Sequence, residues 1–145
     1  MKRLVLSLTV IGLIGLVNPL KAQLMDGHER LKKHVNSVVD EVEETKDPIQ
    51  KRMILDESLG EMITAIDRVS ERGSVSDTDK KGLAKFKEKL NNRKDELNGI
   101  NGFSKVPNNQ LNNYANFIQQ DIEQADAVTI SVTTALLIII ILLLL

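Results

Sequence analysis

The segment from Asp77 to Glu88 carries oxygen-bearing side chains at spacings that could bind a calcium ion. It matches much of the twelve-residue calcium loop, with aspartates at positions one and three, a glycine at position six and a glutamate at position twelve. Position five is Lys81, which places a cation where that loop needs an oxygen ligand. Ser76 and Asp79 also have the spacing of a capping box, and acids are favourable at a helix N-terminus. We expect a capped helix here, with a calcium or small-ligand sensor as the alternative.

The two histidines, His28 and His34, are six residues apart and point in different directions around a helix. They cannot form the i, i+4 pair of a helical zinc site, and the chain has no cysteine. The phosphate-binding, dinucleotide-binding and G-x-S-x-G motifs are also absent. We therefore predict no catalytic, cofactor-binding or metal-binding residue and expect a protein that is not an enzyme. A hydrolase with paired carboxylates would need two acids converging in a cleft, which slender bundles rarely leave.

Residues 1–22 have the pattern of a secretory signal peptide. Two basic residues precede an apolar run over 4–17, and an Asn-Pro pair follows it. As a helix this run covers about 21 Å, which is shorter than the hydrocarbon core of a bilayer. We predict cleavage after Ala22, with an uncleaved N-terminal anchor as the alternative. Either form sends the following residues across the membrane.

Residues 127–145 are uncharged and end in a run of isoleucines and leucines. As a helix they cover about 28 Å, close to the thickness of the bilayer core. A helix that is apolar all round needs apolar surroundings on every side, and residues 23–126 are too few to supply them. We predict a C-terminal transmembrane helix at 127–145 and an extracytoplasmic domain at 23–126.

A hydrophobic tail at the end of the chain also fits a signal for exchange against a glycolipid anchor. Residues 125–127 would then be the small-residue site, 128–134 the spacer and 135–145 the tail. The spacer is short and weakly polar, and the signal peptide is bacterial in style. We therefore favour a single-pass membrane protein of a bacterial cell envelope, with its domain in the periplasm.

Between the two ends, apolar residues recur at alternating steps of four and three. The four stripes are Leu24, His28, Leu31, Val35, Val38 and Val42; Leu55, Leu59, Met62, Ile66 and Val69; Leu83, Phe86, Leu90 and Leu97; and Leu111, Ala115, Ile118, Ile122 and Ala125. Such a repeat puts one apolar seam along each helix, and no segment alternates with period two. We predict an all-α, up-and-down antiparallel bundle of three to four helices with coiled-coil-like seams.

Capping residues predict where these helices begin and end. The predicted starts are Asp47 with Pro48, Ser76, and Pro107 with Asn108, and the predicted ends are Gly73 and Gly99. The one extended linker is expected at 100–106, so consecutive helices should pack antiparallel. Neither glycine nor proline interrupts residues 110–145, so we predict one continuous helix from Asn108 into the bilayer.

Three polar features leave two interpretations each. The acids at 40, 41, 43 and 44 could pair with Lys51 and Arg52 across the first hairpin, or could form a solvated face. The seven asparagines between 98 and 116 could form a polar recognition face, or a loop and a solvated helix face. Arg93 interrupts the third seam and could specify register or partner, or could extend to the rim.

Charge and apolar content narrow the function classes. Residues 23–126 hold 16 basic and 20 acidic side chains, and this mild acidity argues against a nucleic-acid surface. Their apolar residues suffice for seams but not for a deep core, so a protein partner or a homo-oligomer would add burial. We expect a non-enzymatic protein that acts through helix–helix contact and touches membrane lipid through its C-terminal helix.

Overall fold

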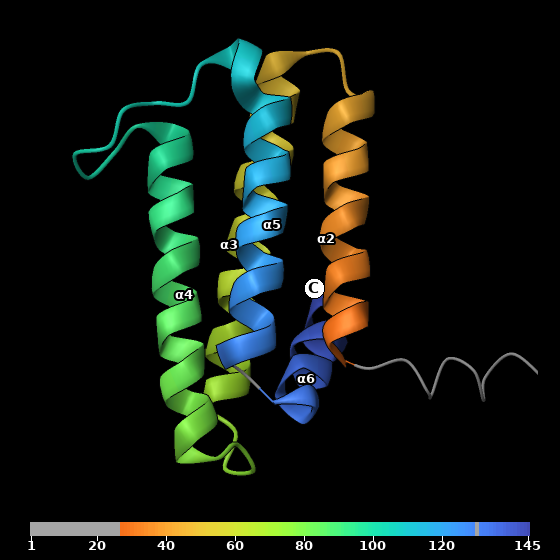
Figure 1. Cartoon of the computed structure of the whole chain (residues 1–145), viewed down its shortest axis with the longest axis vertical. Coiled ribbons are helices and arrows are strands. Elements are labelled where there is room, and N and C mark those ends of the chain that lie inside the picture. Colours follow the sequence, from red (N-terminus) through yellow and green to blue (C-terminus); the bar gives the residue numbers. More distant parts are fainter. Residues whose placement is uncertain (1–26, 130) are drawn as a thin grey trace, which may run out of the picture.

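The computed structural model describes residues 27–129 and 131–145, and every regular element in these ranges is helical (Figure 1). The helices are α2 (Gly27–Glu44), α3 (Pro48–Ser70), α4 (Asp77–Asn98), α5 (Leu111–Thr129) and α6 (Val132–Leu142), and a short 3-10 helix, η1 (Asn108–Gln110), precedes α5. The prediction of an all-α bundle is confirmed, with five α-helices in the described ranges rather than three to four. The predicted signal peptide at 1–22 lies outside them.

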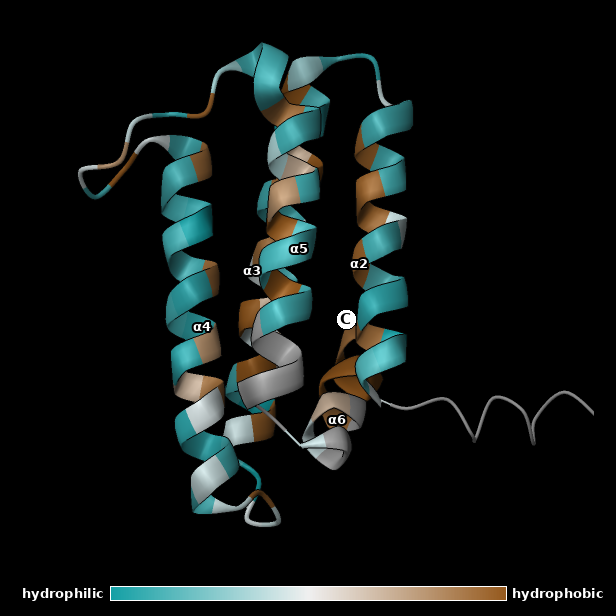
Figure 2. Cartoon of the chain, in the orientation of Figure 1, coloured by the Kyte–Doolittle hydropathy of each residue, from teal (hydrophilic) through white to brown (hydrophobic). Residues whose placement is uncertain are grey.

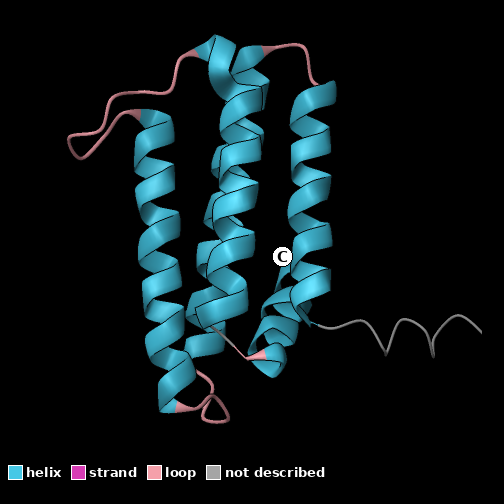
Figure 3. Ribbon diagram, in the orientation of Figure 1, coloured by secondary structure: helices cyan, strands magenta, loops and turns pink. Residues whose placement is uncertain are grey.

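Consecutive helices run in opposite directions, so the chain passes up and down the long axis of the bundle (Figures 1 and 3). Helix α3 packs against α2 and α4, and α5 completes the four-helix arrangement by packing against α2 and α4. Helix α6 then turns back and packs against α2 and α3. The up-and-down order is as predicted, and α6 is an added helix along the α2–α3 pair.

Three of the predicted caps have the expected geometry. The Asp47 carboxylate accepts a hydrogen bond from the Ile49 backbone N–H at 3.0 Å, and the Ser76 hydroxyl accepts one from the Asp79 N–H at 3.1 Å. Gly99 ends α4 with φ +68°, where a Cβ would lie 2.6 Å from the Cβ of Lys105. Gly73 does not end α3, which stops at Ser70, so that prediction is wrong.

Buried apolar side chains follow the predicted seams and form one core. Figure 2 shows the hydropathy along each helix, with hydrophobic and hydrophilic stretches alternating along α2 to α5. Every predicted seam residue of α3 and α4 is buried, as are the first four of α5. The seam patterns missed Val39, Ala65 and Tyr114, which are buried as well. Helices α2 and α3 each pack against several neighbours, so their apolar stripes are wider than a coiled-coil seam. Two predicted seam residues, Leu24 and the side chain of Ala125, lie outside what the structure describes.

The predicted continuous helix from Asn108 to the C-terminus is wrong. Helix α5 ends at Thr129, and Ser131 is the N-cap of α6, its hydroxyl accepting a hydrogen bond from the Thr134 backbone N–H at 3.3 Å. A serine hydroxyl can cap a new helix without any glycine or proline, and the reversal buries one side of α6 against α2 and α3. Within the described part of the chain, none of the helices combines the length and the apolar character that a membrane span requires.

Candidate functional site

The segment from Asp77 to Glu88 belongs to α4, so the loop that the calcium pattern requires is not formed. Two residues apart on a helix, Asp77 and Asp79 point in nearly opposite directions. Across residues 27–129 and 131–145, no three histidine or acidic side chains come together in a way that could hold a metal ion. Asp79 contacts α6 instead, a role that its sequence position did not indicate.

The carboxylate of Asp79 joins the start of α4 to the start of α6. It accepts hydrogen bonds from the Ser131 backbone N–H at 3.3 Å, from the Ser131 hydroxyl at 2.8 Å and from the Thr134 hydroxyl at 2.9 Å. These bonds from Ser131 and Thr134 lower the pKa of Asp79. The negative charge thus lies at two helix N-termini, where helix dipoles favour it.

Helix α6 lies in a groove between α2 and α3, which we call the α2/α3 groove. Its buried side is formed by Ala135, Ile138, Ile139, Ile141 and Leu142. Its other side and its end are also apolar but exposed: Ile140 is 51% exposed, Leu143 76% and Leu144 73%. A helix on the surface of a water-soluble domain normally turns polar residues outward, so exposed isoleucine and leucine here are unusual.

The α2/α3 groove continues as an open cavity of about 270 Å³ where α6 is not present. Its lining combines the apolar Val38 and Ile54 with the acidic Glu57 and Glu61. His34 and Ser37 line both this cavity and a second one, of about 320 Å³, between α2 and the end of α6. Helix α6 therefore fills only part of a longer groove.

His34 lies at the junction of these two cavities. Its Nε2 atom is buried and has no hydrogen-bond partner in the described part of the chain. Burial lowers the pKa of His34, and the nearby Glu61 carboxylate opposes this only in part. The predicted seam of α2 contains His28 and leaves His34 out. The structure instead half-buries His34 and begins the buried stripe of α2 at Gly27.

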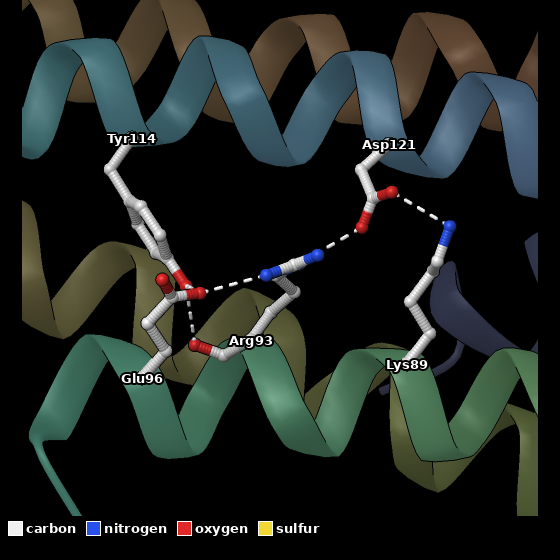
Figure 4. Close-up of polar contacts among 5 residues, drawn as sticks. All are labelled: Lys89, Arg93, Glu96, Tyr114 and Asp121. Carbon is white, nitrogen blue, oxygen red and sulfur yellow. Dashed lines mark hydrogen bonds and ion pairs between the residues drawn. The ribbon is translucent and has the colours of Figure 1, made fainter. Parts of the chain in front are cut away.

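A second polar cluster joins α4 to α5, and its five side chains point toward one another (Figure 4). The Arg93 guanidinium pairs with Asp121 at 2.9 Å and with Glu96 at 2.8 Å. Lys89 donates to the other oxygen of Asp121 at 2.7 Å, and the Tyr114 hydroxyl lies 3.0 Å from Glu96. Arg93 thus fixes how α4 is aligned along α5, which is the register interpretation of its place in the seam.

The electrostatics of this cluster suit a structural role. Burial alone would raise the pKa of Asp121, but hydrogen bonds from Lys89 and Arg93 outweigh it and the pKa is lowered. Burial and the hydrogen bond to Glu96 raise the pKa of Tyr114 well above its usual value. A guanidinium separates the two carboxylates, so they cannot share a proton as a catalytic pair would.

The asparagine-rich stretch is used largely within the molecule. Five of its side chains bond to other residues: Asn98 to Asp56 (2.6 Å), Asn101 to Asp95 (2.8 Å), Asn108 to Arg52 (3.0 Å), Asn112 to Lys51 (2.5 Å) and Asn116 to Glu43 (2.9 Å). Arg52 also donates to the Leu97 and Val106 carbonyls, so it holds the 99–107 connection. Of the two interpretations of the acids at 40, 41, 43 and 44, the structure supports the solvated face: all four are exposed, and Lys51 and Arg52 bond to residues between 97 and 112 instead.

Comparison with known protein families, with curated proteins and with solved structures found no match. The site must therefore be judged by its geometry alone. In the polar cluster between α4 and α5, the charged side chains are paired with one another. The α2/α3 groove with α6 is the candidate functional site, because it holds one apolar helix and has open space beside it.

Proposed function

We propose that this chain is a non-enzymatic, membrane-anchored helical-bundle protein on the extracytoplasmic side, and that it acts through helix–helix contact. The observation that carries the proposal is the apolar surface at the end of α6, where Ile140 and the following Leu143 and Leu144 are exposed while Ile138, Ile139 and Leu142 are buried. An uncharged helix that exposes isoleucine and is followed by exposed leucines suits lipid or a second helix better than water.

Two further observations support a membrane role for residues 127–145. The segment carries no charge, and nineteen residues in one helix would span about 28 Å. The polar contact of its N-terminal part depends on a few hydrogen bonds from Ser131 and Thr134 to Asp79. In the proposed membrane form α6 leaves the groove, α5 and α6 join into one straight helix, and 127–145 becomes the single-pass anchor.

The helix-contact part of the proposal rests on the groove itself. In the structure it accommodates an apolar helix between α2 and α3. Once α6 is in the bilayer, the groove would be free for an amphipathic helix of a protein partner or a second copy. The five polar groups between α4 and α5 are paired with one another, so they leave no free catalytic pair in that cluster.

Liposome flotation of the full chain and of the chain beginning at Gln23 tests the anchor. Ile140 is half-exposed in the groove-bound form, so Ile140→Lys leaves that form intact but places a charge in the membrane segment. A central lysine costs about 2.5–3.5 kcal/mol in a membrane helix, which predicts a loss of flotation of about a hundredfold.

The matched control is Gln124→Lys, which adds the same charge at an exposed position of α5 outside 127–145. It should float like the parent chain. If neither parent chain floats, or if Ile140→Lys floats as well as the parent, the membrane anchor is refuted. The intact mass of the membrane-extracted protein then separates a retained 127–145 from exchange for a glycolipid.

A further inference from the structure

We propose that acid releases α6 from the α2/α3 groove, through one ionisable contact at each end of the helix. Asp79 holds the N-terminal end and His34 lies beside the C-terminal end. The proposal adds regulation to the site described above, and its biological consequence rests on the proposed membrane role. The release itself takes place without lipid.

At the N-terminal end, the contact requires Asp79 to be ionised. Its carboxylate accepts hydrogen bonds from two hydroxyls and one backbone N–H of α6, and Ser76 of its own helix start faces it as well. Protonation turns one carboxylate oxygen into a donor and removes the charge that both helix N-termini favour. The contact is therefore strong at neutral pH and weak in acid.

At the C-terminal end, the contact requires His34 to be neutral. Ile139 and Leu142 of α6 line the same cavity as His34, so the side of this cavity that α6 forms is hydrocarbon. The buried Nε2 has no hydrogen-bond partner among the described residues that could accept a proton from it. Protonating the ring would bury a charge beside hydrocarbon, and moving α6 away would let water reach it.

The charged residues around His34 come from α2 and α3. Helix α2 contributes Arg30 and Lys33, which oppose a positive imidazole, and Glu41 farther along the groove. Helix α3 contributes Glu57 and Glu61, and Glu61 favours the charged ring. Burial outweighs Glu61, since the pKa of His34 is lowered. The surroundings as a whole therefore favour the neutral ring when α6 is bound.

The two contacts respond to acid in the same direction but in different pH ranges. A histidine with a lowered pKa weakens the bound form as the pH falls below the ordinary value of 6.5. An aspartate with a lowered pKa contributes stability above its ordinary value of 3.8, and this is lost as the pH falls through the lowered value. Release thus begins with His34 and is completed with Asp79.

Because the chain has no cysteine, one engineered thiol can report on α6 alone. Ile138 is 1% exposed in the groove, so an Ile138→Cys thiol in the full chain reacts with a soluble reagent only after α6 has moved. Leu90 is fully buried among the other helices, and Leu90→Cys reports general unfolding. Dividing each rate by the rate in denaturant at the same pH removes the pH dependence of the thiol.

Between pH 7 and 5 the normalised rate at position 138 should rise by up to about tenfold per pH unit, while the rate at position 90 stays constant. His34→Gln should flatten this rise, and His28→Gln should not. Asp79→Asn should raise the rate at position 138 about fivefold at pH 7. Asp77→Asn, which removes a charge from the same helix start, should leave it unchanged.

An equal rise at positions 90 and 138 would overturn the proposal, as would an acid response that survives His34→Gln. An Asp77→Asn variant that matches Asp79→Asn would also overturn it, because the effect would then belong to the start of α4. Acid release without liposome flotation would leave this inference standing and refute the membrane anchor. Flotation without acid release would refute this inference and leave the membrane anchor standing.

Discussion

The α4–α5 interface and the α6 interface belong to the same bundle but use different side chains. Between α4 and α5, Arg93 is held by Asp121 and Glu96 in the middle of the contact, and its guanidinium lies 4.6 Å from the centre of the Phe117 ring. Along α6 the described buried side chains are hydrocarbon apart from Thr134, and Asp79 and His34 lie beside its two ends. The first arrangement permits one alignment of two helices, because sliding would separate several charges from their partners.

This difference bears on which helix can change its surroundings. Moving α4 away from α5 would separate Arg93 and Lys89 from their carboxylate partners, and no other groups would pair with them. Moving α6 away breaks a few hydrogen bonds and exposes apolar surface. Apolar surface can be covered again by lipid or by another helix. The bundle thus combines a pair of helices with fixed alignment and a helix suited to more than one environment.

The largest predicted difference concerns core truncation. Phe86→Ala should lower the free energy of unfolding by about 3–5 kcal/mol, because it leaves a cavity in the main core. Ile138→Ala should instead weaken α6 binding and shift the urea midpoint of the other helices little. Urea unfolding followed by circular dichroism measures the first effect, and hydrogen exchange of residues 132–142 the second. Equal losses of urea stability would show that α6 unfolds together with α2–α5.

The main bundle could be predicted from sequence because its signals are local or periodic. Asp47, Ser76 and Gly99 each mark a helix end through bonds to neighbouring residues, and the 4-3 repeat marks the buried sides. The start of α6 at Ser131 could not be predicted in this way. A serine within an uncharged, apolar stretch is compatible with a continuous helix, and its hydroxyl also bonds to the Asp79 carboxylate of another helix, which local sequence does not indicate.

The candidate site was less predictable for the same reason. Asp79 belongs to a calcium-loop pattern in the sequence, but its hydrogen-bond partners Ser131 and Thr134 lie more than fifty residues away. Burial lowers the pKa of His34, and the two cavities that it lines are formed by residues of α2, α3 and the end of α6, which lie far apart in the sequence. The register role of Arg93 was one of two interpretations, and the positions of Asp121 and Glu96 decide between them.

A smaller effect is expected from the polar cluster. Arg93→Met should cost about 1–3 kcal/mol, since it leaves two partly buried carboxylates without their shared partner. A double-mutant cycle with Asp121→Asn measures how much of this comes from the pair. The control is Lys94→Met, whose pair with Asp56 is more exposed and should contribute less than about 1 kcal/mol. Equal costs would mean that Arg93 does not fix the alignment.

The α4–α5 interface should also respond to acid, but later than α6 does. The lowered pKa of Asp121 contributes stability that is present above its ordinary value of 3.8 and is lost as the pH falls through the lowered value. Circular dichroism from pH 7 to 2 should therefore show the main bundle intact at pH 5. Asp121→Asn should lower stability at pH 7 and remove part of the loss below pH 4. Loss of α4–α5 structure at pH 5 would contradict this order.

The smallest effect is expected at the α2–α5 surface, where Lys32 and Glu123 lie 3.4 Å apart and the lysine side chain is 56% exposed. Lys32→Ala should change the free energy of unfolding by less than about 0.5 kcal/mol, because water screens an exposed pair and ordering the side chains opposes it. Urea unfolding should show this small difference at low salt, and high salt should reduce it further. A loss above about 1 kcal/mol would mean that exposed ion pairs also align helices. The partial burial of Arg93 would then not be needed to explain its effect on alignment.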